Sequence, residues 1–402
     1  MKLNQDYIFP DYSKNNIFHL PKSILSILLG KRKVPLEFLK DYCGAETILL
    51  IILDGVGYKL LSNVISKYKL NLPKPIKLTT IYPSTTAAVL TTLSTAKLAG
   101  EHGMIEWNLY IPEINMLIES IPFRPIGAKE YDVLAKQGFK STLLFQGNTI
   151  FSKIRSRGLK CRAYLRAYIH NTSYSRRLLR GCEIKPYINP SDLAVRLRRD
   201  LNNRDRASLY YVYIESPDSI SHLYGYNVEE QHVDIKMTLN LLITELIQKL
   251  NKQVSKETVL ILVSDHGLIT HNPNQIIYLK NIRRYLRIDR NGIPIVSGSP
   301  RNVYLHLKYE SVDRVKKKLE NVIGDKSLIY TKEEFLKTNL VGEVKKQFLE
   351  RIGDIIILPN NSTCIWFKHP IKKKVHTIGF HGGLSENEMI IPIISTKVSE
   401  IL

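Results

Sequence analysis

The segment Thr-Ile-Leu-Leu-Ile-Ile-Leu at Thr47–Leu53, followed by Asp54-Gly55-Val56-Gly57, decides the fold of this 402-residue chain. The run is apolar on both faces of a strand, which is typical of a central strand in a parallel sheet. Asp54-Gly55 alone could form a hairpin turn, but the helical pattern of Tyr58–Tyr68 argues against one. Asp54 is therefore expected at the carboxyl end of the strand, where open α/β sheets bind their ligands.

Further apolar, strand-like segments recur along the chain and alternate with helical patterns. The expected strands are 141–145, 208–214, 258–263 and 389–394, and the longer expected helices are 189–201 and 228–251. Such an alternation predicts an α/β fold with a mostly parallel central sheet.

Residues 278–365 differ in character from the rest of the chain. Short alternating runs such as 301–307 lie among polar helical patterns such as 312–322. We therefore predict a small inserted α+β subdomain at 278–365 and assign 1–277 and 366–402 to the catalytic core.

Residues 151–206 are strongly basic, and Tyr164, Tyr168 and Tyr174 are interleaved with the basic side chains. A basic surface with aromatic residues would suit a phosphate-bearing or nucleic-acid ligand. Charge runs are more commonly solvated connections, and this is the interpretation that we favour here.

The overall composition restricts the function only broadly. Lysine and arginine number 58 against 37 acidic residues, which gives a net charge of +21. This balance suits an acidic substrate, nucleic acid or simply a charged surface, and it is spread along the chain. There is no GxxxxGK[ST] and no GxGxxG, so P-loop and dinucleotide-binding functions have no support.

The cysteines and the apolar runs indicate in which cellular compartment the protein is expected. The four cysteines form no CxxC pair and no metal-ligand spacing: Cys43, Cys161, Cys182 and Cys364. The first residues lack the apolar region of a signal peptide, and no apolar run reaches the roughly 18 residues of a membrane helix. We therefore expect reduced thiols, a cytoplasmic protein and no membrane partner.

The stretch 78–95, Leu-Thr-Thr-Ile-Tyr-Pro-Ser-Thr-Thr-Ala-Ala-Val-Leu-Thr-Thr-Leu-Ser-Thr, predicts a tight connection followed by a helix. Pro83 restricts the connection, and alanine and leucine at helical spacing follow from Ala87 onward. Thr85 or Thr86 would then lie at the helix N-terminus, where free N–H groups favour an anion. An ordinary threonine cap is the alternative explanation.

Carboxylates and imidazoles follow several of the predicted strands. These residues are Asp54, Asp218, His222, Asp265, His266 and, in a glycine-rich loop, His381. Each one alone could be a turn, cap or loop residue. Together they are more informative, because they recur at the same end of predicted parallel strands. Six such ligands suit two metal ions rather than one. Two metals about 4 Å apart can hold both oxygens of a phosphoryl displacement.

With these residues in place, the chain resembles the alkaline phosphatase superfamily, in its type I phosphodiesterase/nucleotide pyrophosphatase branch. The resembling blocks occur in the order of that family and are ILDG at 52–55, YPSTTAAVLTTLST at 82–95, HG at 102–103, ESPDSISH at 215–222, SDHG at 264–267 and GFHGG at 379–383. The resemblance implies a three-layer core and metal-dependent hydrolysis of phosphodiester or nucleotide pyrophosphate bonds.

The same resemblance implies a role for each matching residue. Thr86 would be the nucleophile, because it stands four residues after Tyr82, and it would carry a phosphothreonine intermediate. The metal that activates Thr86 would be held by Asp54, Asp265 and His266. A second metal would be held by Asp218, His222 and His381. The family metal is usually zinc.

The chain departs from the family pattern at three positions. Ala87 stands where nucleotide pyrophosphatases have an aromatic residue that stacks on the base. Trp107 aligns with a phosphate-binding asparagine, so the neighbouring Asn108 becomes the substrate-binding candidate. Ser221 replaces a common glycine before His222.

Two other functions stay open at this point. One is a phosphomonoesterase, sulfatase or phosphomutase of the same superfamily, since these enzymes share the metal ligands. The other is an inactive basic protein that binds nucleic acid, although such a protein would be expected to have lost some of the ligands. A nucleotide or another phosphate ester is the expected partner, and the oligomeric state is left open.

Overall fold

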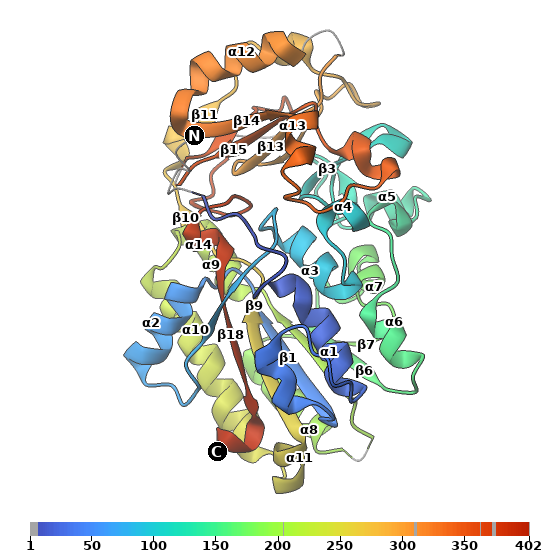
Figure 1. Ribbon diagram of the computed structural model, residues 1–402, viewed down its shortest axis with the longest axis vertical. Coiled ribbons are helices and arrows are strands. Elements are labelled where there is room, and N and C mark those ends of the chain that lie inside the picture. Colours follow the sequence, from blue (N-terminus) through green and yellow to red (C-terminus); the bar gives the residue numbers. More distant parts are fainter. Residues whose placement is uncertain (1–6, 204, 309–311, 362, 372–374, 402) are drawn as a thin grey trace.

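The computed structural model describes residues 7–203, 205–308, 312–361, 363–371 and 375–401. Its strands form two seven-stranded sheets and two short two-stranded ones. Helices cover both faces of one seven-stranded sheet, which we call the main sheet, and the second sheet lies beyond one end of it (Figure 1). Within the described part of the chain, no helix is long and apolar enough to span a membrane.

The main sheet is built around β1, as the apolar run predicts. Its strand order is β2 (Ile76–Thr79), β18 (Ile390–Lys397), β9 (Thr258–Ser264), β1 (Thr47–Leu53), β8 (Leu209–Ile214), β6 (Cys161–Arg166) and β7 (Glu183–Tyr187). All seven residues of β1 are buried, and β1 pairs in parallel with β8 and β9. β18 runs antiparallel to both of its neighbours, β2 and β9, whereas the other described strand pairs of this sheet are parallel. The predicted α/β fold with a mostly parallel sheet is therefore confirmed.

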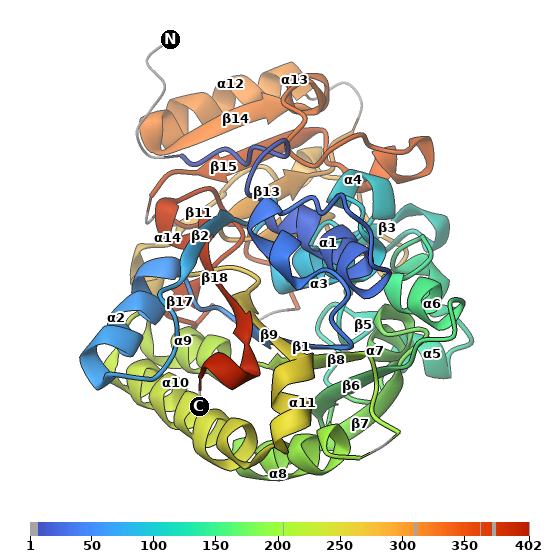
Figure 2. The same ribbon diagram turned by 60° about the horizontal axis from the view of Figure 1, so that its bottom comes forward.

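Alternate residues of β1 pack into two helical layers, because successive side chains of a strand point to opposite faces. Ile48, Leu50 and Ile52 join a cluster with α1 (Leu20–Leu28), α3 (Thr86–Thr95), α6 (Ile150–Arg155) and α7 (Ser173–Leu178). Leu49, Ile51 and Leu53 pack with α2 (Tyr58–Tyr68), α8 (Pro190–Leu201) and α10 (Glu229–Leu241). Figure 2 shows the two groups of helices on opposite sides of these strands.

Two expectations about the middle of the chain were wrong. Residues 151–206 are not a solvated connection, because they supply β6, α7, β7 and α8, and four of the six β6 residues are buried. The segment 141–145 is not a strand but a 3₁₀ turn at Ser141–Leu143 followed by two core residues. Arginine side chains, rather than a neighbouring strand, bind its carbonyl groups: Arg351 donates to Leu144 O at 2.7 Å, and Arg177 donates to Phe145 O.

The second sheet is antiparallel throughout its described pairs. Its order is β14 (Ser327–Thr331), β15 (Ile355–Pro359), β13 (Asn302–Leu305), β12 (Val296–Ser299), β3 (Asn108–Ile111), β4 (Met116–Glu119) and β5 (Arg124–Pro125). It therefore extends beyond the segment 278–365, since β3, β4 and β5 come from residues 108–125. The pair Gly298–Asn108 joins the two parts. The division of the chain into domains stays a prediction.

Candidate active site

The register of β1 and β9 places two carboxylates side by side at the carboxyl edge of the main sheet. Leu53 pairs with Ser264, so the residues that follow them, Asp54 and Asp265, are neighbours. Gly55 then turns the chain with φ 71° and donates its N–H to Asp265 Oδ1 at 3.2 Å. A side chain at Gly55 would collide with Asp218, since a Cβ there would lie 2.9 Å from the Cβ of that residue.

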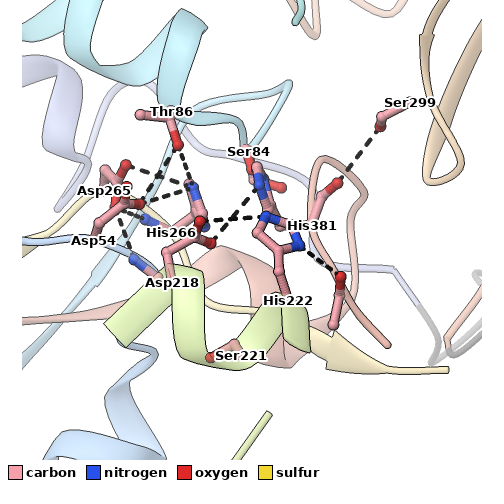
Figure 3. A network of polar contacts seen from close by, with 12 residues as sticks. Asp54, Ser84, Thr86, Asp218, Ser221, His222, Asp265, His266, Ser299 and His381 are labelled. Carbon is pink, nitrogen blue, oxygen red and sulfur yellow. Dashed lines mark hydrogen bonds and ion pairs between the residues drawn. The ribbon is translucent and has the colours of Figure 1, made fainter. Parts of the chain in front are cut away.

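Helix α3 places Thr86 above these carboxylates. Thr85 is the N-cap and accepts a hydrogen bond from Ala88 N, so Thr86 is the first helical residue. The hydroxyl of Thr86 donates to Asp54 Oδ1 at 3.4 Å and lies 3.1 Å from His266 Nε2 (Figure 3). The expected helix N-terminus is therefore present, and its hydroxyl is directed at the strand ends.

Helix α9 (Ser216–Tyr224) contributes Asp218 and His222 from the turn after β8. Residues four apart share one face of a helix, and His222 Nε2 lies 3.2 Å from Asp218 Oδ2. The other nitrogen of His222, Nδ1, is 2.8 Å from Gly379 O. That contact joins α9 to the segment that carries His381.

His381 follows the short strand β17 (Gly379–Phe380) and completes the cluster. Its Nδ1 is 3.1 Å from Ser84 O, which leaves Nε2 directed toward Asp218 at 3.9 Å. The imidazole stacks on His266 with ring centroids 3.8 Å apart (Figure 3). The six residues expected from the strand ends thus lie together with Thr86.

The donor atoms fit divalent cations. Ligand atoms of Asp54, Asp265 and His266 lie within 4.8 Å of one another, and so do those of Asp218, His266 and His381. Asp265 Oδ2 and Asp218 Oδ1 are buried and have no hydrogen-bond partner among the described residues, as expected of oxygens that can bind a metal ion. His222 belongs to neither group of three and contacts Asp218 instead. The assignment of each residue to a particular metal stays a prediction.

The electrostatics of the cluster also favour cations. Burial, together with Asp265 and Asp218, raises the pKa of Asp54 well above its ordinary value, and burial raises the pKa of Asp265 to about 6. Burial alone would raise the pKa of Asp218, but the adjacent histidines, with His222 contributing most, together outweigh it and lower the pKa of this carboxyl. Burial lowers the pKa of His266 to about 4 and of His381 to about 3, so both imidazoles are neutral and can donate a lone pair.

The sequence profile described as type I phosphodiesterase / nucleotide pyrophosphatase matches residues 48–384. The chain belongs to this family.

Solved structures of the type I phosphodiesterase family share the fold. Murine ectonucleotide pyrophosphatase / phosphodiesterase 5 superposes with a TM-score of 0.65 at 17% identity, covering 86% of this chain and 87% of that one. An inactive variant of that murine protein, solved with AMP, gives a TM-score of 0.64 at 18% identity, covering 87% of each chain. At such identities the likeness shows the fold alone.

A curated relative covers a shorter stretch. An uncharacterized pyrophosphatase/phosphodiesterase of Schizosaccharomyces pombe is 32% identical over 84 residues, which are 21% of this chain. The match spans 17% of the length of the yeast protein.

Asn108, the residue expected to bind substrate in this phosphodiesterase-family site, lies on the wall of the cavity beside the cluster. Its Nδ2 donates to Gly298 O at 2.8 Å, so the amide also joins β3 to β12. Trp107 lines the same cavity and is 37% exposed. The role of Asn108 toward substrate stays a prediction.

The sequence reasoning missed two residues that lie at the candidate site. Tyr213 on β8 donates its hydroxyl to Asp54 Oδ2. Glu106, which is 1% exposed, lines the cavity, and its carboxylate accepts from Trp107 N at 2.6 Å and from Asn302 Nδ2 at 3.1 Å. Burial raises the pKa of Glu106 to about 7. The sequence signal for Glu106 was its position shortly after the HG pair at 102–103.

A buried ion pair supports the loop that carries His381. Arg301 Nη2 lies 2.7 Å from Glu388 Oε2, and both side chains are fully buried. Glu388 also accepts from Gly383 N at 2.9 Å. A Cβ at Gly383 would come within 2.9 Å of the guanidinium, so glycine permits this close approach. Arg301, in the turn between β12 and β13, thereby joins the second sheet to the loop that carries the candidate ligand His381.

Proposed function

We propose that this protein hydrolyses phosphodiester or nucleotide pyrophosphate bonds through a phosphothreonine intermediate on Thr86. The observation that carries the proposal is the position of the Thr86 hydroxyl, 3.4 Å from Asp54 Oδ1 and 3.1 Å from His266 Nε2. Membership of the type I phosphodiesterase family supports the same reaction class.

Two divalent cations, for which we propose Zn²⁺, would when bound stabilise the ionised Thr86 and neutralise charge on the phosphoryl group. Asp54, Asp265 and His266 would hold one cation next to Thr86. Asp218, His222 and His381 would hold the other.

The residues of the chain provide the remaining steps. The Thr86 oxygen attacks phosphorus, and the bond from phosphorus to the leaving oxygen breaks in line with the attack. The free N–H groups at the start of α3 can bind a phosphoryl oxygen, because a helix N-terminus stabilises negative charge. Water then attacks the same phosphorus and releases Thr86. Tyr213 keeps Asp54 oriented toward Thr86.

The murine relative solved with AMP supports a nucleotide as one class of substrate. A phosphomonoesterase is the alternative within the superfamily, and it would use the same ligands. The cytoplasmic location stays a prediction.

The test compares hydrolysis of bis-p-nitrophenyl phosphate and p-nitrophenyl phosphate, with chelator and with added Zn²⁺. Thr86→Ala is expected to lower metal-dependent turnover of the diester by about 10⁴-fold or more, because the nucleophile is removed. Thr86→Ser keeps a hydroxyl and should retain measurable activity. The matched control is Thr95→Ala at the other end of α3, where the hydroxyl donates to Thr91 O.

Three results would exclude Thr86 as the nucleophile or favour one of the alternative functions. Full metal-dependent turnover by Thr86→Ala would exclude Thr86 as the nucleophile. A preference for the monoester would move the function to a phosphatase. Salt-sensitive nucleic-acid binding without bound metal or turnover would favour an inactive binding protein.

A further inference from the structure

Two of the four cysteines, Cys161 and Cys182, lie at the start of neighbouring strands. The register of β6 and β7 pairs Arg162 with Glu183 in parallel. The residues that precede this pair are the two cysteines, so they stand opposite each other. Adjacent strands are about 5 Å apart, which is within the range of Cα separations that a disulfide spans. The fold therefore brings together two thiols whose spacing along the chain shows no motif.

The two cysteine side chains point to the same face of the main sheet. Cys161 belongs to the core cluster on the α3 side, and Cys182 packs against that cluster. Burial raises the pKa of the Cys182 thiol well above its ordinary value, and the adjacent Cys161 thiol raises it further. A neighbouring group has such an effect at short range, so the sulfur atoms are close as well as the backbones.

The backbone that leads into Cys182 is held against α6. Gly181 has φ 110°, and a Cβ there would lie 2.5 Å from Ser152 N, so the chain passes directly over the helix. Arg180 O accepts from Ser152 Oγ at 2.9 Å, and Cys182 N donates to Leu179 O at 2.8 Å. Cys182 is therefore fixed in its place opposite Cys161.

The competing explanation is a pair of cysteines that only fills space, because a buried free cysteine behaves as a small apolar side chain. The difference in exposure favours a reactive pair. Cys182 is only partly buried, whereas Cys161 is 4% exposed. A small reagent can thus reach Cys182 first, and Cys161 is placed to attack the product. The other two cysteines lie elsewhere, since Cys43 is exposed and Cys364 belongs to the core of the second sheet.

We propose that Cys161 and Cys182 form a reversible disulfide that cross-links β6 to β7 when a small external disulfide is present. The cross-link closes the segment 162–181, which carries Tyr168, Tyr174 and Leu178 on the wall of the cavity beside Thr86. Oxidation therefore stabilises one wall of the candidate site. This inference does not depend on the proposed function, because both thiols lie outside the ligand cluster.

The oxidation proceeds by two thiol–disulfide exchanges. The Cys182 thiolate attacks one sulfur of the external disulfide, and a small thiol leaves. The Cys161 thiolate then attacks the Cys182 sulfur of this mixed disulfide and displaces the second small thiol. The two protein thiols are oxidised, and the external disulfide is reduced to two thiols that take up the two protons. Because the pKa of Cys182 is raised, the first exchange is slow at neutral pH and faster at pH 9.

The test treats the full chain, reduced and then freed of reductant, with oxidised glutathione. Peptide mapping without reduction is expected to recover peptides joined through Cys161 and Cys182, and dithiothreitol should separate them. The melting temperature of the oxidised protein should exceed that of the reduced protein by about 4 °C, because the cross-link restricts the unfolded chain.

Two variants identify the thiols that are responsible. Cys43→Ser, at the exposed cysteine, is the matched control and should keep the whole shift in melting temperature. Cys182→Ser should show no shift on oxidation. The reduced form of each protein is its own reference, so a lower stability of Cys182→Ser does not obscure the result.

Amide hydrogen exchange measures the effect on the cavity wall. Oxidation should slow exchange in α7 and β7 by about tenfold, because local opening of this edge of the sheet is restricted. Exchange in α12 (Val312–Ile323), which packs on the second sheet, should stay unchanged.

Each other outcome overturns a defined statement. Thiols that stay reduced, or glutathione held on Cys182 as the only product, would overturn the proposed cross-link. A cross-link that leaves melting temperature and exchange unchanged would overturn its stabilising role. Formation of the cross-link as described, without turnover of bis-p-nitrophenyl phosphate in either redox state, would support the disulfide and contradict the proposed function.

Discussion

The two seven-stranded sheets contribute to the site in different ways. The main sheet supplies the metal-ligand candidates, because Asp54, Asp218 and Asp265 follow the ends of its parallel strands. The second sheet supplies neighbours that bind or orient other side chains, such as Asn302 and Arg301. The candidate reactive groups therefore lie together because parallel strands end at one edge of a sheet. The side chains that orient them come close through contacts between distant segments of the chain.

The two sheets contact each other through one core cluster, which contains Ile52 of β1 together with Tyr304 and Ile356 of the second sheet. The ion pair between Arg301, in the turn between β12 and β13, and Glu388, just before β18, also joins them. If the division of roles is correct, changes in the main sheet should abolish catalysis, and changes in the second sheet should mainly alter stability.

The largest effect is expected from Asp54→Asn in the main sheet. If Asp54 binds a metal beside Thr86, its loss should lower turnover of the diester by more than about 10³-fold and reduce the bound metal by about one ion per chain. Elemental analysis and steady-state kinetics measure the two quantities. Asp41→Asn, at an exposed position, is the control. Unchanged metal content in Asp54→Asn would contradict the assignment of this ligand.

The next effect is expected from Arg301→Met, which leaves the buried Glu388 carboxylate without its partner. Breaking such a pair costs about 3–5 kcal/mol of unfolding free energy. Urea unfolding followed by circular dichroism measures the loss. The double variant Arg301→Met/Glu388→Leu should recover part of it, because no buried charge is left alone. A loss of less than 1 kcal/mol in the single variant would show that the ion pair does not hold the sheets together.

The smallest effect is expected from Glu106→Gln, and it depends on pH. Burial raises the pKa of Glu106 from 4.5 to about 7. A carboxyl with a raised pKa contributes its stability at low pH and loses it as pH rises through the folded value. The variant should therefore gain stability relative to the wild type between pH 5 and pH 8, by up to about 3 kcal/mol. Urea unfolding at both pH values measures this, and a difference that does not change with pH would contradict it.

The main sheet and the clustering of the carboxylates and imidazoles at its edge could be predicted from the sequence for physical reasons. A strand buried on both faces has to be apolar throughout, so β1, β8 and β9 are visible as continuous runs. The residues after such strands share one edge of the sheet, and Asp218 and His222 are four apart on a helix. These relations are local, and a single sequence displays them.

The rest of the site depends on contacts that no local pattern encodes. Glu106 and Asn302 are 196 residues apart in the chain, and β3 joins a sheet whose other central strands begin near residue 296. The predicted strand at 141–145 was wrong for the same reason, since the distant Arg351 donates hydrogen bonds to backbone carbonyl oxygens of this segment. Tyr213 was visible only as part of an apolar run, although its hydroxyl is bound to Asp54.

The place of β18 in the main sheet bears on the order in which the chain folds. This strand lies between β2 and β9, yet residues 390–397 are far in sequence from residues 76–79 and 258–264. Closing such long loops is slow, and until it happens both neighbours expose unpaired edges that can recruit other chains. The segment that precedes β18 also carries Glu388 and His381. A folding intermediate without this strand would therefore be prone to aggregate and would have a candidate metal ligand out of place, so insertion of β18 completes the sheet and the candidate site together.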